Sequence, residues 1–148
     1  MGIHVTRRLT DLGAGAILAP ERFDPRRQAF PKSSRRLADY VEVLTENVSA
    51  PALDPGVLVL ILDTTHAYDG FVIFRHEPVA PRELGSAKRR LRPGDVIISR
   101  LRPYLRQVAY VDAQLFALVP GGNEVAASTE FFVLRGRAGF DAACLVPF

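Results

Sequence analysis

The sequence predicts a strand-rich α+β domain with few helices. Short runs of β-branched and aliphatic residues recur along the chain, and turn signals rich in Gly, Pro and Asp separate them. The chain has 148 residues, of which 48% are hydrophobic, so it is large enough for one domain with a buried core. No apolar run approaches the roughly 18 residues that indicate a membrane helix, and we expect no span.

The first half of the chain contains three strand-like runs. Residues 40–48 alternate well enough for a strand, although a short helix fits them too. Residues 57–62, VLVLIL, form a continuous aliphatic run that predicts a buried strand. Asp69-Gly70 separates this run from a further strand at 71–74, so we expect a hairpin-like arrangement of the two.

The second half adds shorter runs of the same kind. Residues 95–101 follow a Pro-Gly turn, Pro103 breaks the run, and residues 107–111 resume it. A strand is expected at 125–134, and a helix at 140–146.

Charge is divided into blocks of alternating sign. Residues 1–36 carry +5, residues 37–81 carry −6, residues 82–106 carry +6, and residues 107–148 carry −2. The net charge of +3 therefore hides two basic blocks, which a fold can place on one face or use to neutralise the acidic block. Because arginine binds phosphate bidentately and stacks on bases, an arginine-rich block points to a polyanion, most plausibly nucleic acid.

The strongest candidate interface is the segment 100–106. In an extended backbone Arg100, Arg102 and Tyr104 share a face, on which they can hold phosphates, stack on a base or read guanine. The alternative is a solvated hairpin end with a packed tyrosine. A second basic group, Lys88-Arg89-Arg90-Leu91-Arg92, suits sequence-independent phosphate contact, or is simply a solvated basic loop.

Other motifs favour structural roles. Ser128 and Thr129 are expected to satisfy backbone groups, and Glu130 to pair with an arginine rather than act as a catalytic acid. The three histidines have no metal-ligand spacing, and the single cysteine, Cys144, fits a reducing compartment such as the cytoplasm. We expect no cofactor, no metal site and no catalytic activity.

Two runs together resemble the target-recognition domain of type I restriction–modification specificity subunits. They are LRPGDVIISRLRPYLRQVA at 91–109 and STEFFVLR at 128–135, in the family's order and spacing. RFDP at 22–25 and LTENV at 44–48 are similar to the segment that leads into the family's domain. The resemblance spans roughly residues 21–146.

The resemblance implies a twisted, β-helix-like set of short strands that reads one half of a split DNA site without catalysis. Its implied partners are double-stranded DNA and the methyltransferase and restriction subunits of a type I complex. We expect residues 1–148 to be a single domain of this kind, truncated before the helical spacer that follows it in the family. The predicted DNA-binding residues are Lys88, Arg89, Arg90, Arg92, Arg100, Arg102, Tyr104 and Arg106.

Two other functions remain compatible with the sequence. A module that binds single-stranded RNA would stack bases on Tyr104, Tyr110 and exposed phenylalanines. A protein-interaction module would instead bring the arginines against an acidic partner.

Overall fold

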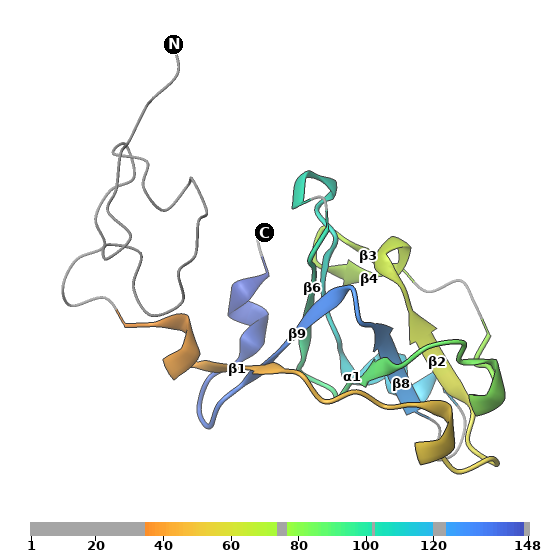
Figure 1. Cartoon of the computed structure of the whole chain (residues 1–148). Helices are drawn as coiled ribbons and strands as arrows, with labels where there is room; N and C mark the ends of the chain where they lie inside the picture. The colour runs from red at the N-terminus through yellow and green to blue at the C-terminus, as the bar shows by residue number, and fades with distance from the viewer. Residues whose placement is uncertain (1–34, 74–76, 102, 120–123, 147–148) are drawn as a thin grey trace, which may run out of the picture. The chain divides into compact units, whose positions relative to one another are not determined.

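Nine short strands in three sheets form the framework of the described chain in the computed structural model (Figure 1). The structure describes residues 35–73, 77–101, 103–119 and 124–146, with only the backbone of Pro103. The described residues from 36 onward belong to one compact unit. The dominance of strands confirms the strand-rich fold class that the sequence predicts.

The first sheet contains four antiparallel strands in the order β1-β9-β6-β7. They are β1 (Val41–Leu44), β9 (Phe131–Gly136), β6 (Val96–Ser99) and β7 (Val108–Tyr110). The strands expected at 40–48, 95–101 and 107–111 are therefore present in shortened form. Because β6 is hydrogen-bonded to β9 on one side and β7 on the other, the loop that follows β6 starts from a fixed position.

The second sheet has the order β2-β8-β5, with β2 parallel and β5 antiparallel to β8. Its strands are β2 (Val59–Leu62), β8 (Glu124–Ser128) and β5 (Lys88–Arg90). The buried strand expected at 57–62 is confirmed, with Leu60 and Leu62 fully buried. The basic loop expected at 88–92 is wrong for its first three residues, because pairing with β8 makes them an edge strand.

A two-stranded hairpin corrects the pairing that the sequence predicts. Strands β3 (Ala67–Tyr68) and β4 (Phe71–Val72) pair with each other across Asp69-Gly70, whose φ angles of 49° and 96° suit a tight hairpin turn. The expected hairpin between 57–62 and 71–74 is wrong, since β2 pairs with β8 instead. The prediction of a turn at Asp69-Gly70 is confirmed, but the turn joins β4 to the short strand β3 and not to β2.

The single strand expected at 125–134 is two strands, β8 and β9, which belong to different sheets. Between them the hydroxyl of Ser128 accepts a hydrogen bond from the Glu130 amide at 3.3 Å. The turn moves the chain from one sheet to the other, and side chains from both strands still enter the same core. Polar turn residues inside an apolar run mark this break.

The main core lies between the two larger sheets. It combines Leu60 and Leu62 from β2, Ile97 from β6, and Phe131 and Val133 from β9. A second cluster covers the other face of the β2-β8-β5 sheet, and a third lies where the last 3-10 helix contacts β6 and β9. Apolar side chains on alternate positions thus fix both sheets.

Helical structure in the described residues is short. The α-helix α1 spans Ala113–Ala117, and its N-terminus is capped by Asp112, whose carboxylate accepts from the Leu115 amide at 3.0 Å. The 3-10 helices are Leu37–Asp39 (η3), Ala50–Ala52 (η4), Thr64–His66 (η5), Pro81–Glu83 (η6), Pro103–Leu105 (η7) and Ala142–Leu145 (η8). The helix expected at 140–146 is therefore a 3-10 helix. Within the described ranges, no helix is long and apolar enough to cross a membrane.

Candidate nucleic-acid interface

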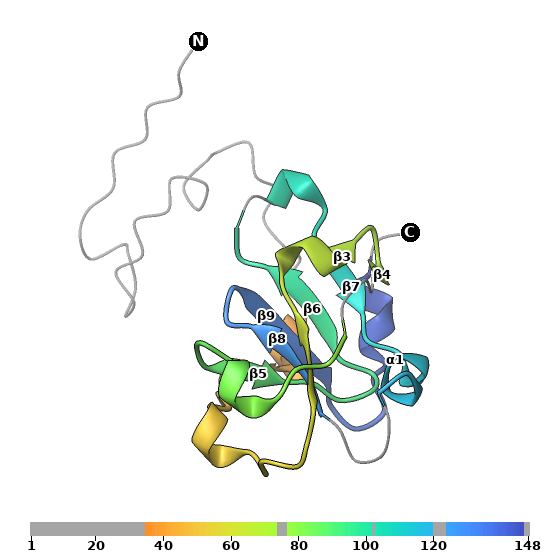
Figure 2. The same cartoon turned by 90° about the vertical axis from the view of Figure 1, so that its right-hand side faces the viewer.

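The loop between β6 and β7, here called the 100–106 loop, contains four of the eight predicted DNA-binding residues. It stands at the top of the views in Figures 1 and 2. Residues 103–105 form η7, so the extended backbone that the sequence suggested is wrong there, and with it the argument that alternate side chains share a face. Arg102 lies outside the described residues.

The turn between β8 and β9 braces one side of the 100–106 loop. The Arg100 amide donates to the Glu130 carbonyl at 2.8 Å, and the Arg100 guanidinium lies 5.2 Å from the centroid of the Phe132 ring. Ser99 adds a local bond, its hydroxyl donating to the Leu101 carbonyl at 2.9 Å. This contact between Glu130 and Arg100 is made by backbone atoms, and the pairing of the Glu130 side chain with an arginine stays a prediction.

The turn between β3 and β4 braces the other side. The Asp69 amide donates to the Arg106 carbonyl at 3.0 Å, and the Arg106 guanidinium donates back to the Asp69 carboxylate at 3.0 Å. The two residues also share a backbone feature, with φ angles of 49° and 53°. They are the only non-glycine residues with positive φ in the described chain, and such conformations persist where surrounding contacts fix them.

The tip of this braced loop is open to solvent. Tyr104 is 75% exposed and Leu101 is half-exposed. The side chains of Arg100 and Arg106 are exposed on either side of the 3-10 helix in the sequence. An aromatic ring, an aliphatic side chain and two guanidinium groups are thus accessible together on a loop with fixed ends.

The basic residues of β5 have a different environment, because each of them donates at least one side-chain hydrogen bond to a group within the fold. Lys88 donates to the Ser86 carbonyl at 2.8 Å and to the Ser86 hydroxyl at 2.7 Å. Arg89 donates to the Leu44 carbonyl at 2.7 Å and is partly buried. Arg90 makes two bonds of 2.8 Å to the carboxylate of Glu124.

The structure does not gather the predicted residues into one cluster. In Figure 2 β5 lies well below the 100–106 loop; β5 belongs to the β2-β8-β5 sheet, whereas the loop connects β6 and β7 of the other large sheet. Arg92 is exposed in the turn after β5. Of the first basic block, residues 1–34 lie outside the described residues, as does the family-like segment at 22–25.

Sequence reasoning missed a buried ion pair at the foot of β6. Asp95 is 0% exposed, and its carboxylate accepts two bonds of 2.8 Å from Arg135 and one of 2.8 Å from the Arg92 amide. The hydrogen bond to Asp95 raises the pKa of the Arg135 guanidinium, although desolvation acts in the opposite direction. The pair joins the two runs that resemble the specificity-subunit family. The sequence offered one signal for this pair, a single charged residue at one end of each apolar run: Asp95 before residues 96–98 and Arg135 after residues 131–134.

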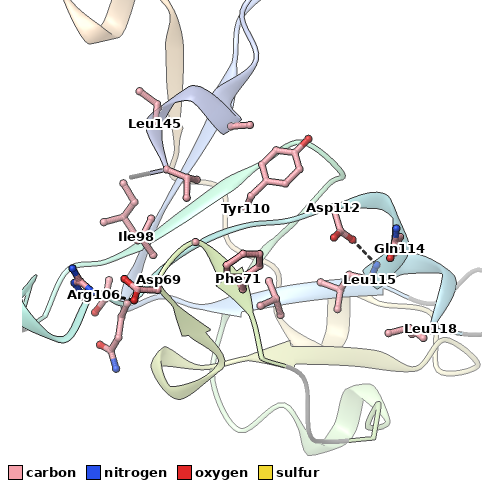
Figure 3. Close-up of a pocket in the computed structure, with 17 residues that line it drawn as sticks. Asp69, Phe71, Ile98, Arg106, Tyr110, Asp112, Gln114, Leu115, Leu118 and Leu145 are labelled. Carbon is pink, nitrogen blue, oxygen red and sulfur yellow. Dashed lines mark hydrogen bonds and ion pairs between the residues drawn. The ribbon is translucent and has the colours of Figure 1, made fainter. Parts of the chain in front are cut away.

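A largely apolar groove of about 1090 Å³ was also missed, because its lining comes from β4, β6, β7, α1 and η8. Figure 3 shows the Asp69–Arg106 pair at one end, and Asp112 and Gln114 toward the other. The apolar lining labelled there is Phe71, Ile98, Tyr110, Leu115, Leu118 and Leu145. One end of the groove therefore lies at the Asp69–Arg106 pair, which fixes the 100–106 loop.

The described residues contain no metal-binding cluster. In the part of the chain that the structure describes, no three His, Cys, Asp or Glu side chains are grouped closely enough to hold a metal ion. His66 has a local role, with its Nδ1 accepting from the Asp63 amide at 3.0 Å. This bond belongs to the capping of η5.

The fold is similar to that of a chain in a solved structure. That structure is described as the structural basis of complex assembly and conformational transition of the type I R-M system. The sequence identity is 23% and the TM-score is 0.50, with 64% of this chain covered. The match spans 23% of the other chain, and at this identity it shows likeness of fold alone. No protein-family model and no curated protein matches the sequence.

Proposed function

We propose that this chain is a DNA-recognition domain of the kind found in type I specificity subunits, which reads one half of a bipartite site and has no catalytic activity of its own. The observation that carries the proposal is the 100–106 loop, which presents Arg100, Tyr104 and Arg106 to solvent on a stem braced from both sides. The likeness of fold to a chain of a type I R-M system supports the same function.

Within this proposal, the guanidinium groups of Arg100 and Arg106 bind phosphate, and Arg92 adds a further exposed cation. Phosphate contacts set affinity and position, whereas side chains that reach base edges set specificity. Lys88, Arg89 and Arg90 are secondary, because phosphate would have to replace bonds that their donors make within the fold. Arg102, for which no geometry is described, stays a predicted contact.

The remaining parts of the proposal concern the setting of the domain. We propose a cytoplasmic location and assembly with the methyltransferase and restriction subunits of a type I complex. The twisted, β-helix-like course of the family's strands is likewise a proposal for this chain. A co-purification experiment with a type I methyltransferase subunit tests assembly, and its failure would leave DNA binding unaffected.

The primary test is fluorescence anisotropy with a short mixed-sequence duplex over a series of salt concentrations. We expect log K to fall linearly with log salt concentration, with a slope of about −0.9 for each phosphate contact. Competition with single-stranded RNA separates this proposal from its alternative. Displacement of the duplex by RNA at equal or lower concentration would contradict the preference for DNA.

Single-charge variants locate the interface. Arg100→Ala removes a guanidinium from the loop, and Arg82→Ala removes an exposed guanidinium from η6, in a different part of the fold. We expect Arg100→Ala to reduce the salt slope by about 1 and Arg82→Ala to change it much less. Equal effects of the two would show that net charge, and not this loop, determines binding.

A further inference from the structure

We propose that Tyr104 is a stacking wedge, which enters the base stack of duplex DNA at a weakened step while Arg100 and Arg106 hold the flanking phosphates. This inference rests on the proposed DNA-binding function and adds a mode of engagement to it. The partner is a duplex in which one base step is open or easily opened.

The stem of the loop is held at both ends by hydrogen bonds. The loop leaves β6 with the Arg100 amide bonded to Glu130, and it enters β7 with the Arg106 carbonyl bonded to the Asp69 amide. Between these points residues 103–105 form η7, and Arg102 lies outside the described residues. A tip held in this way enters DNA without first losing much conformational freedom, so more of its contact energy remains for distorting the duplex.

The tip of the loop exposes apolar side chains to solvent. Tyr104 is 75% exposed although its ring is largely apolar, and the neighbouring Leu101 is 50% exposed. Proteins that kink DNA insert such side chains between base steps, and aromatic rings stack on any base because every base presents a π face. Burial in a base stack would remove from water a surface that the fold itself leaves open.

Two exposed arginines flank the tip of the loop in the sequence. Arg100 and Arg106 lie on either side of η7 in the sequence, and both are exposed. The Arg100 guanidinium lies over the Phe132 ring, 5.2 Å from its centroid, and the residue is exposed, so its N–H groups can reach phosphate. The Asp69 carboxylate orients the Arg106 side chain at 3.0 Å, and phosphate would compete with it for the same N–H groups.

The test compares two short duplexes of the same sequence, one intact and one with a single central abasic site. Unstacking is already complete at an abasic site, so a wedge binds there more tightly. We expect wild type to prefer the abasic duplex by about tenfold, within the range measured for stacking on an aromatic side chain. Tyr104→Ala should lose this preference and Tyr104→Phe should keep it.

A matched control removes an exposed apolar side chain elsewhere. Leu118→Ala alters a residue at the end of α1 that is 62% exposed, and it should keep the full preference. Equal preference in wild type and Tyr104→Ala would overturn the wedge, as would wild type that binds both duplexes equally. In both cases salt-dependent DNA binding would stand. If neither duplex is bound, the proposed function and the wedge fall together.

Discussion

The 100–106 loop and strand β5 have similar compositions but very different environments. Each carries several basic residues within a few positions, and the sequence alone predicts phosphate contacts for both. In the structure, β5 is paired with β8 and its side chains bond to nearby carbonyl and carboxylate groups. The loop is fixed by backbone bonds and by the Arg106–Asp69 pair, and Arg100, Tyr104 and Arg106 remain exposed. Local charge alone therefore does not identify an interface, because the exposure of the cations and their bonds within the fold also matter.

The largest expected effect is a loss in the free energy of unfolding when the buried Asp95–Arg135 pair at the start of β6 is broken. Arg135→Ala would leave the buried carboxylate of Asp95 without its partner, and removal of one partner from a buried pair costs about 3–5 kcal/mol. Arg90→Ala is the matched control, because Arg90 makes the same bidentate contact at 2.8 Å with the more exposed Glu124. It should cost about 0–1 kcal/mol.

Urea unfolding of the two variants measures the difference in their free energies of unfolding. A loss below about 1 kcal/mol in Arg135→Ala would contradict the role assigned to the buried pair. An equally large loss in Arg90→Ala would show that β5 is braced as strongly as β6, and the contrast between the two regions would disappear.

A smaller effect is expected at Arg106, whose φ of 53° is unfavourable for any residue with a Cβ. Arg106→Gly and Arg106→Ala both remove the guanidinium and its contact with Asp69. The glycine variant should be more stable by about 1 kcal/mol, because only alanine keeps the backbone strain. Thermal unfolding of both variants measures this difference. Equal stabilities would mean that the loop backbone differs from the one described.

The smallest effect is expected at the tip itself. Tyr104→Ala should change the free energy of unfolding by no more than about 0.5 kcal/mol, because the ring is mostly exposed in the folded protein. Urea unfolding tests this, and a loss well above 1 kcal/mol would place the ring in the fold instead of leaving it for a ligand. Because its stability is unchanged, Tyr104→Ala then reports on DNA binding alone.

Elements with strong local signals could be predicted from the sequence. The aliphatic run at 57–62 gave a buried strand, and Asp69-Gly70 gave a hairpin turn. Pairing partners could not be predicted, because the parallel contact of β2 with β8 joins segments more than 60 residues apart in the register Val59 to Glu124. β5 has no apolar alternation, so its strand is created by tertiary pairing alone.

The candidate site was predicted in part. The chemical character of the 100–106 loop follows from its composition, but its braces come from Asp69 and Glu130, which are distant in sequence or contribute backbone atoms. The Asp95–Arg135 pair spans 40 residues and carries no motif of its own. The loop and β5 differ in the bonds that their basic side chains make within the fold, and these bonds cannot be read from the sequence.

The most direct test of this account removes two charges from each region and compares duplex binding. Arg100→Ala with Arg106→Ala is set against Lys88→Ala with Arg90→Ala, and thermal unfolding confirms that each variant is folded. Anisotropy over a salt series should show a slope reduced by about 2 for the loop pair, and a much smaller change for the β5 pair. A reduction as large or larger for the β5 pair would contradict the account.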